Sequence, residues 1–284
     1  MLKYDLSYSL MFCLKKYETQ IGTKDHHMRL AAALNQLKNN VLVFSLCSTL
    51  LLTMTIAPEA NAGAAFWQST NIQYLYGGGF KLGSKDRSTI TVEHANAWKY
   101  GDTFFFLDVT DPEIDRTGST TGLYSELSPR FSLGKILNKN LSFPFVKDVL
   151  VATTLEMGSG FHNYLYGVGL SLDLPKFSFA DINFYVRNDP KQKGATYQIT
   201  PAWSLPFNVG NAKLVFEGFG DFAGSEGNLA FNIDLQPRLL LDLGNFWGSP
   251  DCLYGGTEVI YWHNKFGVKG VEEIAPQVMV KWVF

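Results

Sequence analysis

Hydrophobic and polar positions alternate with a period of two at the end of the chain. Residues 275–284 read APQVMVKWVF, so Trp282 and Phe284 extend a valine face while Lys281 lies on the other face. A period of two indicates a β-strand, and this strand has one polar and one apolar side. The apolar side must be covered either by a protein core or by lipid.

The same alternation recurs from residue 71 onward in segments of about ten residues, separated by clusters of Gly, Pro, Asn and Asp. The predicted strands are 71–82, 87–97, 103–110, 121–133, 147–157, 163–174, 178–188, 195–204, 212–222, 228–241, 253–264 and 273–284. Their charged side chains fall on the polar faces, with the exception of Lys147 at a strand end. A soluble ligand-binding barrel has its charges outside, whereas an apolar outer face suits lipid, where a midplane charge costs about 2–4 kcal/mol. The sequence therefore predicts an all-β fold, a transmembrane antiparallel β-barrel of about 12 strands in the Gram-negative outer membrane, with both termini periplasmic.

The N-terminal part has a different pattern. Val41–Ile56 is an apolar or small-residue run that follows basic residues and precedes an Ala-Asn-Ala site at 60–62. This arrangement is typical of a secretory signal peptide and is short for a membrane-spanning helix. We expect residues 1–62 to be an extended N-terminus and signal peptide, cleaved after Ala62, with Met28 as the native start. Residues 63–284 then form the barrel.

Composition narrows the possible partners and cofactors. The formal charge is -2 at pH 7, so there is no basic footprint for a nucleic acid polymer. Of the three cysteines, Cys13 and Cys47 fall in the predicted leader, which leaves Cys252 without a disulfide partner. The acidic stretch 111–115 lacks the glycine that a calcium loop requires at its turn, where Arg116 stands. We expect no metal and no cofactor.

Four short motifs carry a resemblance to a known family. They are FWQSTN at 66–71, ELSPRFSL at 126–133, LSFPFVK at 141–147 and YWH at 261–263. In this order and spacing the chain resembles the Tsx-type nucleoside-specific channels of the Gram-negative outer membrane, a group that includes OmpK-like outer-membrane proteins. The resemblance spans most of the chain after residue 62. The predicted outer loops of this chain are shorter than those of the better-known members of the family.

The resemblance implies a function and a set of partners. It implies a monomeric twelve-stranded barrel whose narrow pore passes nucleosides and deoxynucleosides by facilitated diffusion, and which also serves as a phage receptor in some members. The expected partners are nucleosides, outer-membrane lipid and lipopolysaccharide, the barrel assembly machinery and phage. The terminal Phe284, together with Trp282, resembles the C-terminal signal by which outer-membrane barrels are recognised for assembly.

The strand faces predict which side chains line the pore. Turning Asp108 inward also turns Phe104 and Phe106 inward and leaves Phe105 for lipid. Aromatic rings stack with bases for about 1–3 kcal/mol each, and carboxylates and arginines can hydrogen-bond ribose hydroxyls and base edges. The predicted substrate-binding residues are Phe104, Phe106, Asp108, Tyr124, Glu126, Arg130, Tyr185, Arg187, Glu217, Phe219, Asp221, Arg238, Glu258 and Trp262.

Two further readings of these residues stay open. The inward aromatic rings could simply fill a narrow barrel. Glu126, Arg130, Asp234 and Arg238 could pair with one another and make the wall rigid. The excess of acidic over basic inward side chains predicts a pore that repels anions and therefore nucleotides.

Other functions of such a barrel are also open. It could be a general small-solute porin, or a surface or phage-receptor barrel without a selective nucleoside site. An outer-membrane enzyme would need a nucleophile, a histidine and an orienting group together on the lipid face. His94 and His263 are predicted to lie there, but no serine elbow accompanies them. We expect that the protein is not an enzyme.

Overall fold

The computed structural model describes residues 65–111 and 121–284. The predicted leader, its cleavage site and the start at Met28 lie outside the described residues, as does most of the acidic stretch 111–115. None of the helices in the described ranges is long and apolar enough to cross a membrane.

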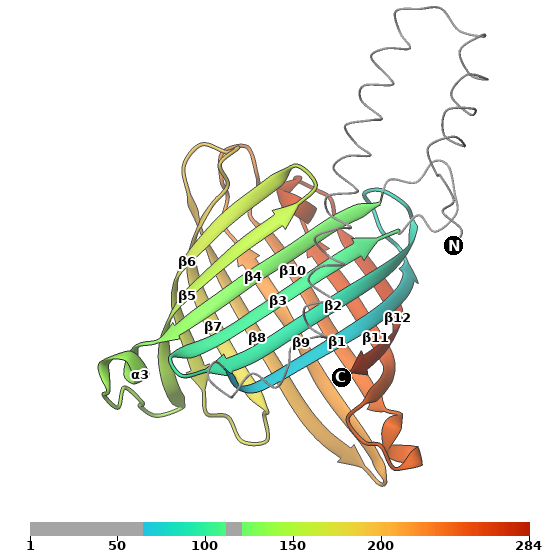
Figure 1. The fold of residues 1–284 in the computed structure, drawn as a ribbon. Helices are drawn as coiled ribbons and strands as arrows, with labels where there is room; N and C mark the ends of the chain where they lie inside the picture. The colour runs from blue at the N-terminus through green and yellow to red at the C-terminus, as the bar shows by residue number, and fades with distance from the viewer. Residues whose placement is uncertain (1–64, 112–120) are drawn as a thin grey trace, which may run out of the picture. The chain divides into compact units, whose positions relative to one another are not determined.

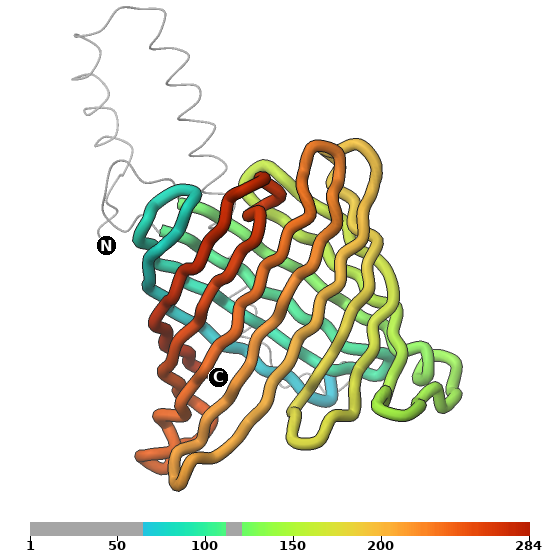
Figure 2. Tube along the Cα trace, turned by 180° about the vertical axis from the view of Figure 1, so that it is seen from behind, coloured from blue at the N-terminus to red at the C-terminus, as the bar shows by residue number. Residues whose placement is uncertain are grey.

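The described chain is one sheet of twelve antiparallel strands that closes on itself, with β1 next to β12 (Figure 1). The strands are β1 (Ala65–Gly78), β2 (Asp86–Trp98), β3 (Gly101–Thr110), β4 (Gly122–Ser132), β5 (Val146–Gly158), β6 (Phe161–Leu172), β7 (Phe179–Asn188), β8 (Thr196–Val209), β9 (Ala212–Ala223), β10 (Asn232–Asp242), β11 (Leu253–His263) and β12 (Glu273–Val283). Every strand pairs with its sequence neighbour, and the tilted strands wind around a common axis (Figure 2). The predicted barrel is confirmed. Because the strand number is even, the start of β1 and the end of β12 lie at the same end of the barrel.

The first strand is longer than predicted. It begins at Ala65 instead of residue 71, and its first part pairs with β2 alone, as in Ala65↔Trp98 and Gln68↔Asn96. Pairing with β12 starts only at Asn71↔Val283. The stretch FWQST has no clean alternation, so a period-two search ends the strand too early.

Contacts between strands that are not neighbours define the inside of the barrel. Arg238 on β10 donates to Glu93 on β2, although β11, β12 and β1 lie between these strands in the sheet. Residues directly opposite on antiparallel neighbours share a face, so Phe106, which is opposite Glu93, also points inward. The outward face carries exposed rings near both rims, as predicted for the lipid side: Tyr74, Tyr76, Tyr164, Tyr166, Trp282 and Phe284.

Five prolines lie inside the described strands, and three of them, Pro129, Pro201 and Pro237, occupy strand interiors where the missing N–H would break a ladder. The repeated context of Pro129 and Pro237 in the sequence suggests either a sheet edge or a strand end near the interface, and the closed barrel excludes the edge. Each lies instead at a local gap in pairing with the next strand: β4 skips from Leu127 to Arg130 against β5, and β10 skips from Leu235 to Arg238 against β11. Pro201 occupies a similar gap between β8 and β9. These three prolines therefore lie where the next strand does not need their N–H.

The end opposite the start of β1 and the end of β12 has turns that are tied to one another. Glu226 accepts a hydrogen bond from the Asp189 N–H at 2.9 Å, which links the turn after β9 to the turn after β7. The short helix η2 (Lys265–Gly267) buries Lys265 against Glu273, and Glu273 also accepts from the Lys81 N–H at 2.7 Å. Burial lowers the pKa of Lys265, with the ion pair to Glu273 acting in the opposite direction. These contacts between neighbouring turns hold this rim of the barrel together.

The opposite end carries both short links and links that contain a helical turn. Residues 99–100 and 210–211 connect strands directly. A short helix α3 (Leu133–Leu137) follows β4, where the sequence predicted only a loop, and η1 (Gly244–Trp247) follows β10. This is the end at which Phe284 finishes the chain.

The position of Phe284 gives a prediction about assembly. Its N–H donates to the Thr70 carbonyl at 2.9 Å, and its ring stacks on Trp282 at 5.6 Å between centroids while remaining exposed to the outside. Phe284→Ser should leave the chain unassembled in the periplasm, because the exposed terminal ring pair is lost. The measurement is the amount of heat-modifiable protein in outer-membrane fractions. Val278→Ser, an exposed change on the same face of β12, serves as the control and should assemble; equal amounts of both variants would contradict the role of Phe284.

Candidate functional site

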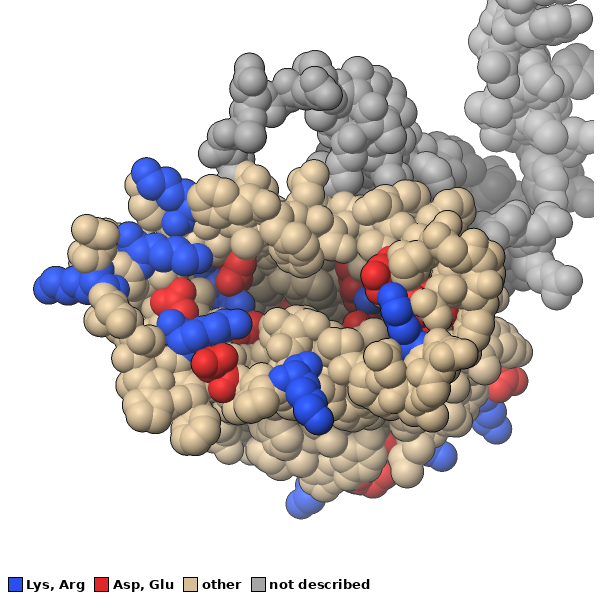
Figure 3. Space-filling model, turned by 90° about the horizontal axis from the view of Figure 1, so that it is seen from below, with Lys and Arg blue, Asp and Glu red and all other residues tan. Residues whose placement is uncertain are grey.

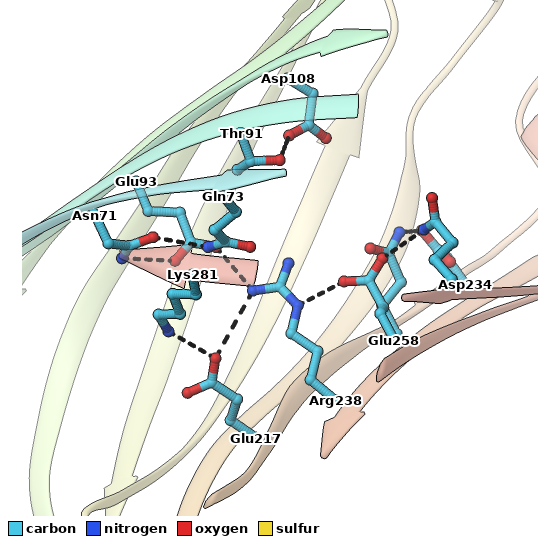
Figure 4. Close-up of polar contacts among 12 residues, drawn as sticks. Asn71, Gln73, Thr91, Glu93, Asp108, Glu217, Asp234, Arg238, Glu258 and Lys281 are labelled. Carbon is cyan, nitrogen blue, oxygen red and sulfur yellow. Dashed lines mark hydrogen bonds and ion pairs between the residues drawn. The ribbon is translucent and has the colours of Figure 1, made fainter. Parts of the chain in front are cut away.

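Arg238 is the centre of a polar network on one side of the lumen (Figure 4). Its Nε donates to Glu258 at 2.5 Å and its Nη1 donates to Glu93 at 2.9 Å. Lys281 donates to Glu217 at 2.7 Å, and Glu217 also lies 3.9 Å from Arg238. The network therefore joins β2, β9, β10, β11 and β12 through the inside of the barrel.

A second network joins the opposite side. Arg130 on β4 holds Asp102 with two hydrogen bonds of 2.7 and 2.9 Å and reaches Asp181 on β7 at 2.9 Å. Arg187 on β7 donates to Glu156 on β5 at 2.5 Å. Asp102 lies directly opposite Arg130 on the adjacent strand β3, whereas the Arg130–Asp181 and Arg187–Glu156 contacts each pass over at least one intervening strand and so cross the inside of the wall.

The predicted pairing of Glu126, Arg130, Asp234 and Arg238 with one another is wrong. Both arginines are ion-paired, but with other carboxylates. Glu126 accepts from the Tyr124 hydroxyl at 2.5 Å, and Asp234 accepts from Gln236 at 2.9 Å. The partners differ because they are set by the closure of the barrel, which brings distant strands together.

The two networks leave packed side chains behind them. Behind the Arg238 network, the inward residues of β1 and β12 are buried, among them Gln73, Leu75 and Gln277. Behind the Arg130 and Arg187 pairs, the inward residues of β5, β6 and β7 are buried, among them Leu165 and Tyr185. Two opposite sides of the lumen are thus filled.

The remaining space lies between these sides, and we call it the slit. One wall is formed by β3 and the upper part of β4, and the other by β8 and β9, because these strands lie between the two packed sides in the sheet order. Phe104 is 39% exposed although it points inward, and Asp108, Phe219 and Asp221 are partly exposed. Viewed from the end at which Phe284 finishes the chain, the molecule is hollowed in the middle, with acidic and basic side chains around the opening (Figure 3).

Aromatic rings form a continuous row along one wall of the slit. Phe104 lies 5.9 Å from Phe106, Phe106 lies 5.6 Å from Tyr124, and Tyr124 stacks on Phe161 at 6.1 Å between centroids. The first three were predicted to face inward, and the structure places them so. Phe161 was missed, because the sequence placed it in a loop at 158–162, whereas β6 begins at this residue.

Four inward carboxylates receive hydrogen bonds only from neutral donors. Asp108 accepts from Thr91 and Asp221 from Thr200, both at 2.5 Å. Glu126 and Asp234 have the partners given above, and Asp234 lies directly opposite Asp221 in the β9–β10 pair. Among the described residues, none of the four takes part in an ion pair with Lys or Arg. In their ionised form they make the slit electronegative.

Comparisons with known proteins agree with this architecture. The family model described as "Nucleoside-specific channel-forming protein, Tsx" matches residues 62–238. The chain belongs to this family. The match includes β1 to β9 and most of β10, and therefore the aromatic row and the four carboxylates; Glu258, Trp262 and Phe284 lie beyond it.

Two relatives of this Tsx-family chain are outer membrane proteins OmpK. The protein from Vibrio parahaemolyticus is 27% identical over 185 residues, which are 62% of this chain and 64% of the relative. That of Vibrio parahaemolyticus serotype O3:K6 (strain RIMD 2210633) is 24% identical, over 61% of this chain and 66% of the relative. The match thus spans less than two thirds of each relative. The solved structure of the KdgM porin is 11% identical, with a TM-score of 0.45, and covers 76% of this chain and 99% of the porin. Family and fold place this chain in the Gram-negative outer membrane.

Three predicted site residues lie away from the slit in this Tsx-family barrel. Tyr185 is buried and its hydroxyl contacts Thr154, so it fills the wall between β5 and β7. Glu258 is buried in the Arg238 network. Trp262 packs against Phe266 at 5.0 Å, close to the rim. The other predicted residues line the slit or hold its sides in place.

The two outward histidines that the sequence singled out, His94 and His263, have ordinary structural partners. His94 contacts Thr70 at 2.8 Å and Asn96 at 3.2 Å. His263 pairs with Glu272 at 2.8 Å at the rim. In the described ranges, neither ring makes a hydrogen bond to a serine, so the arrangement expected of a lipase or acyltransferase is not found there.

Proposed function

We propose that this protein is an outer-membrane channel for the facilitated diffusion of nucleosides and deoxynucleosides. The observation that carries the proposal is the row of rings from Phe104 to Phe161 beside a slit whose two other sides are filled. A flat base fits between close walls, and each stack with a ring is worth about 1–3 kcal/mol without requiring a particular base. The rings are spaced closely enough for a base to pass from one to the next.

The carboxylates of the slit suit the sugar part of the same solute. Asp108 and Glu126 lie beside the aromatic row and keep lone pairs that ribose hydroxyls can use. Their negative charge repels a phosphate group inside a low-dielectric wall. The slit should therefore favour the neutral nucleoside over its nucleotide. The family match, whose description is nucleoside-specific, supports the same substrate class.

The test is solute uptake by liposomes that contain the purified protein. Nucleosides should enter clearly faster than sugars of equal size, while nucleoside monophosphates should enter slowly. The sugar is the matched control because it has the same bulk and hydroxyl groups but no flat ring to stack. Equal rates for nucleoside and sugar would contradict the proposal and indicate a general small-solute porin.

A further inference from the structure

The turn between β4 and β5, residues 133–145, is the longest described link at the end where Phe284 finishes the chain. It contains α3 and, after it, a tight turn in which Phe143 and Val146 exchange backbone hydrogen bonds of 3.0 and 2.8 Å. Figures 1 and 2, which view the barrel from opposite sides, both show this segment standing out sideways from the wall. We call residues 133–147 the β4–β5 turn, including the first residues of β5. It lies away from the slit.

Its large apolar side chains are turned outward. Their exposed fractions are 48% for Ile136, 55% for Leu137, 53% for Phe143 and 73% for Phe145. None of the residues in α3 is buried. A link exposed to water on all sides would be expected to carry polar side chains, so this set indicates a contact surface.

Phe145 is held outward by an unusual backbone. Its φ is 66°, in the left-handed region that glycine or asparagine normally occupies in such a turn. Phe145 follows Pro144, and its carbonyl accepts from the Asp173 N–H at 2.9 Å, so the neighbouring turn fixes it. A phenylalanine in this position costs backbone energy and contributes no core contact in return. An outside partner for the ring would account for both facts.

The charge of the turn indicates what that partner is. Lys135, Lys139 and Lys147 are distributed along it, and residues 133–147 include no Asp or Glu. Basic side chains beside exposed Leu, Ile and Phe are typical of segments that lie in a membrane interface with anionic lipids.

The neighbouring wall is continuous with this surface. Trp98 at the end of β2 packs edge-on against Phe131 at 5.6 Å and against Tyr100 at 6.3 Å between ring centroids. Phe131 lies at the end of β4, shortly before the β4–β5 turn begins. Such rings mark the level of the membrane interface. By the rule for bacterial barrels, the end at which the first strand begins and the last strand ends faces the periplasm, so this is the interface of the inner leaflet of the outer membrane.

We propose that the β4–β5 turn is a lipid-binding anchor: its apolar side chains enter the inner leaflet and its lysines bind the phosphate groups of anionic phospholipids. The anchor is independent of nucleoside passage. Its role is to fix the height and tilt of the barrel on this side.

The experiment uses single cysteines that carry an environment-sensitive fluorophore, in the full chain with Cys252→Ser, refolded into phosphatidylcholine vesicles. Cys13 and Cys47 are also changed to Ser, so that each variant carries one cysteine. Ile136→Cys and Leu137→Cys report the turn, and Asn211→Cys, in the exposed link 210–211 at the same end, is the matched control. The fluorophore at 136 or 137 should be quenched by a lipid with a nitroxide near its headgroup and shielded from aqueous iodide. The fluorophore at 211 should be accessible to iodide and should be quenched little by the nitroxide lipid. Heat-modifiable migration verifies that each variant is folded.

The charge contribution is tested separately. Adding phosphatidylglycerol to the vesicles should enrich this lipid around the barrel, measured by native mass spectrometry. Changing Lys135, Lys139 and Lys147 to Gln should reduce that enrichment by about fivefold for each lysine that reaches the surface. Lys213→Gln, at the same end, is the control. Unchanged enrichment in the triple variant would overturn the headgroup contact.

Two results would overturn the insertion of the turn. One is equal iodide access at 136, 137 and 211. The other is shielding at 136 and 137 in native envelopes but not in pure lipid vesicles, which would assign the surface to a periplasmic protein. Nucleoside uptake should be unchanged in all of these variants, so failure of the anchor and failure of the proposed channel function are distinguishable.

Discussion

Replacing both Phe104 and Phe106 with alanine should raise ion conductance and at the same time weaken block by nucleoside. Each lost stack removes about 1–3 kcal/mol of binding, so the nucleoside concentration that gives half-maximal block in planar bilayers should rise by about one to two decades. Conductance should rise because two large side chains leave the slit. The opposite signs of the two effects separate a binding defect from misfolding.

Phe105→Ala is the matched control on the same strand. Phe105 lies opposite His94 on the outward face, between the two inward rings. Its loss should leave block unchanged and only reduce the stability of the barrel. A nucleoside monophosphate should remain a poor blocker of the native protein, of the Phe104 and Phe106 double variant and of Phe105→Ala, because all three keep the carboxylates of the slit. If Phe105→Ala weakened block and the double change did not, the aromatic row would have no part in binding.

Arg238→Met should cause the largest loss of stability in the lumen. Arg238 is the shared partner of Glu93 and Glu258, and all three side chains are largely buried. Removing it takes away the cation that pairs with both buried carboxylates, for which a loss of about 3–5 kcal/mol is expected. The measurement is the urea midpoint for loss of the heat-modifiable form in vesicles.

The control and the rescue isolate the charge effect. Lys281→Met removes a cation that pairs with Glu217 alone and should cost less. Adding Glu258→Gln to Arg238→Met should recover part of the lost stability, because one of the two uncompensated charges is removed. If the double variant were no more stable than Arg238→Met, the loss would come from packing and not from charge.

The sequence was sufficient for the barrel and for the facing of its side chains. A period of two separates the inward and outward faces of each strand without knowledge of neighbours, which is why Phe104, Phe106 and Tyr124 were placed correctly. It fails where a strand lacks alternation, as at the start of β1, and where a strand begins earlier than the turn signals suggest, as at Phe161.

The partners inside the lumen could not be found in this way. Arg238 and Glu93 are far apart in the sequence, and their contact depends on the radius and tilt of the closed sheet. The same holds for Arg130 and Asp181. Strand periodicity gives the direction of a side chain but not the distance across the barrel. Periodicity correctly turned Tyr185 inward and so predicted that it faces the solute. In the closed barrel this side chain is buried beside the Arg187 and Glu156 pair.

The ion pairs that cross the lumen also determine how the pore treats solutes of increasing width. Widening the slit would pull Arg238 from Glu93 and Arg130 from Asp181, and breaking such buried pairs is costly. Thermal fluctuations of the wall therefore give little extra room. The permeation rate should therefore fall abruptly once the solute is thicker than the slit. In a more compliant barrel the rate would fall gradually with solute thickness.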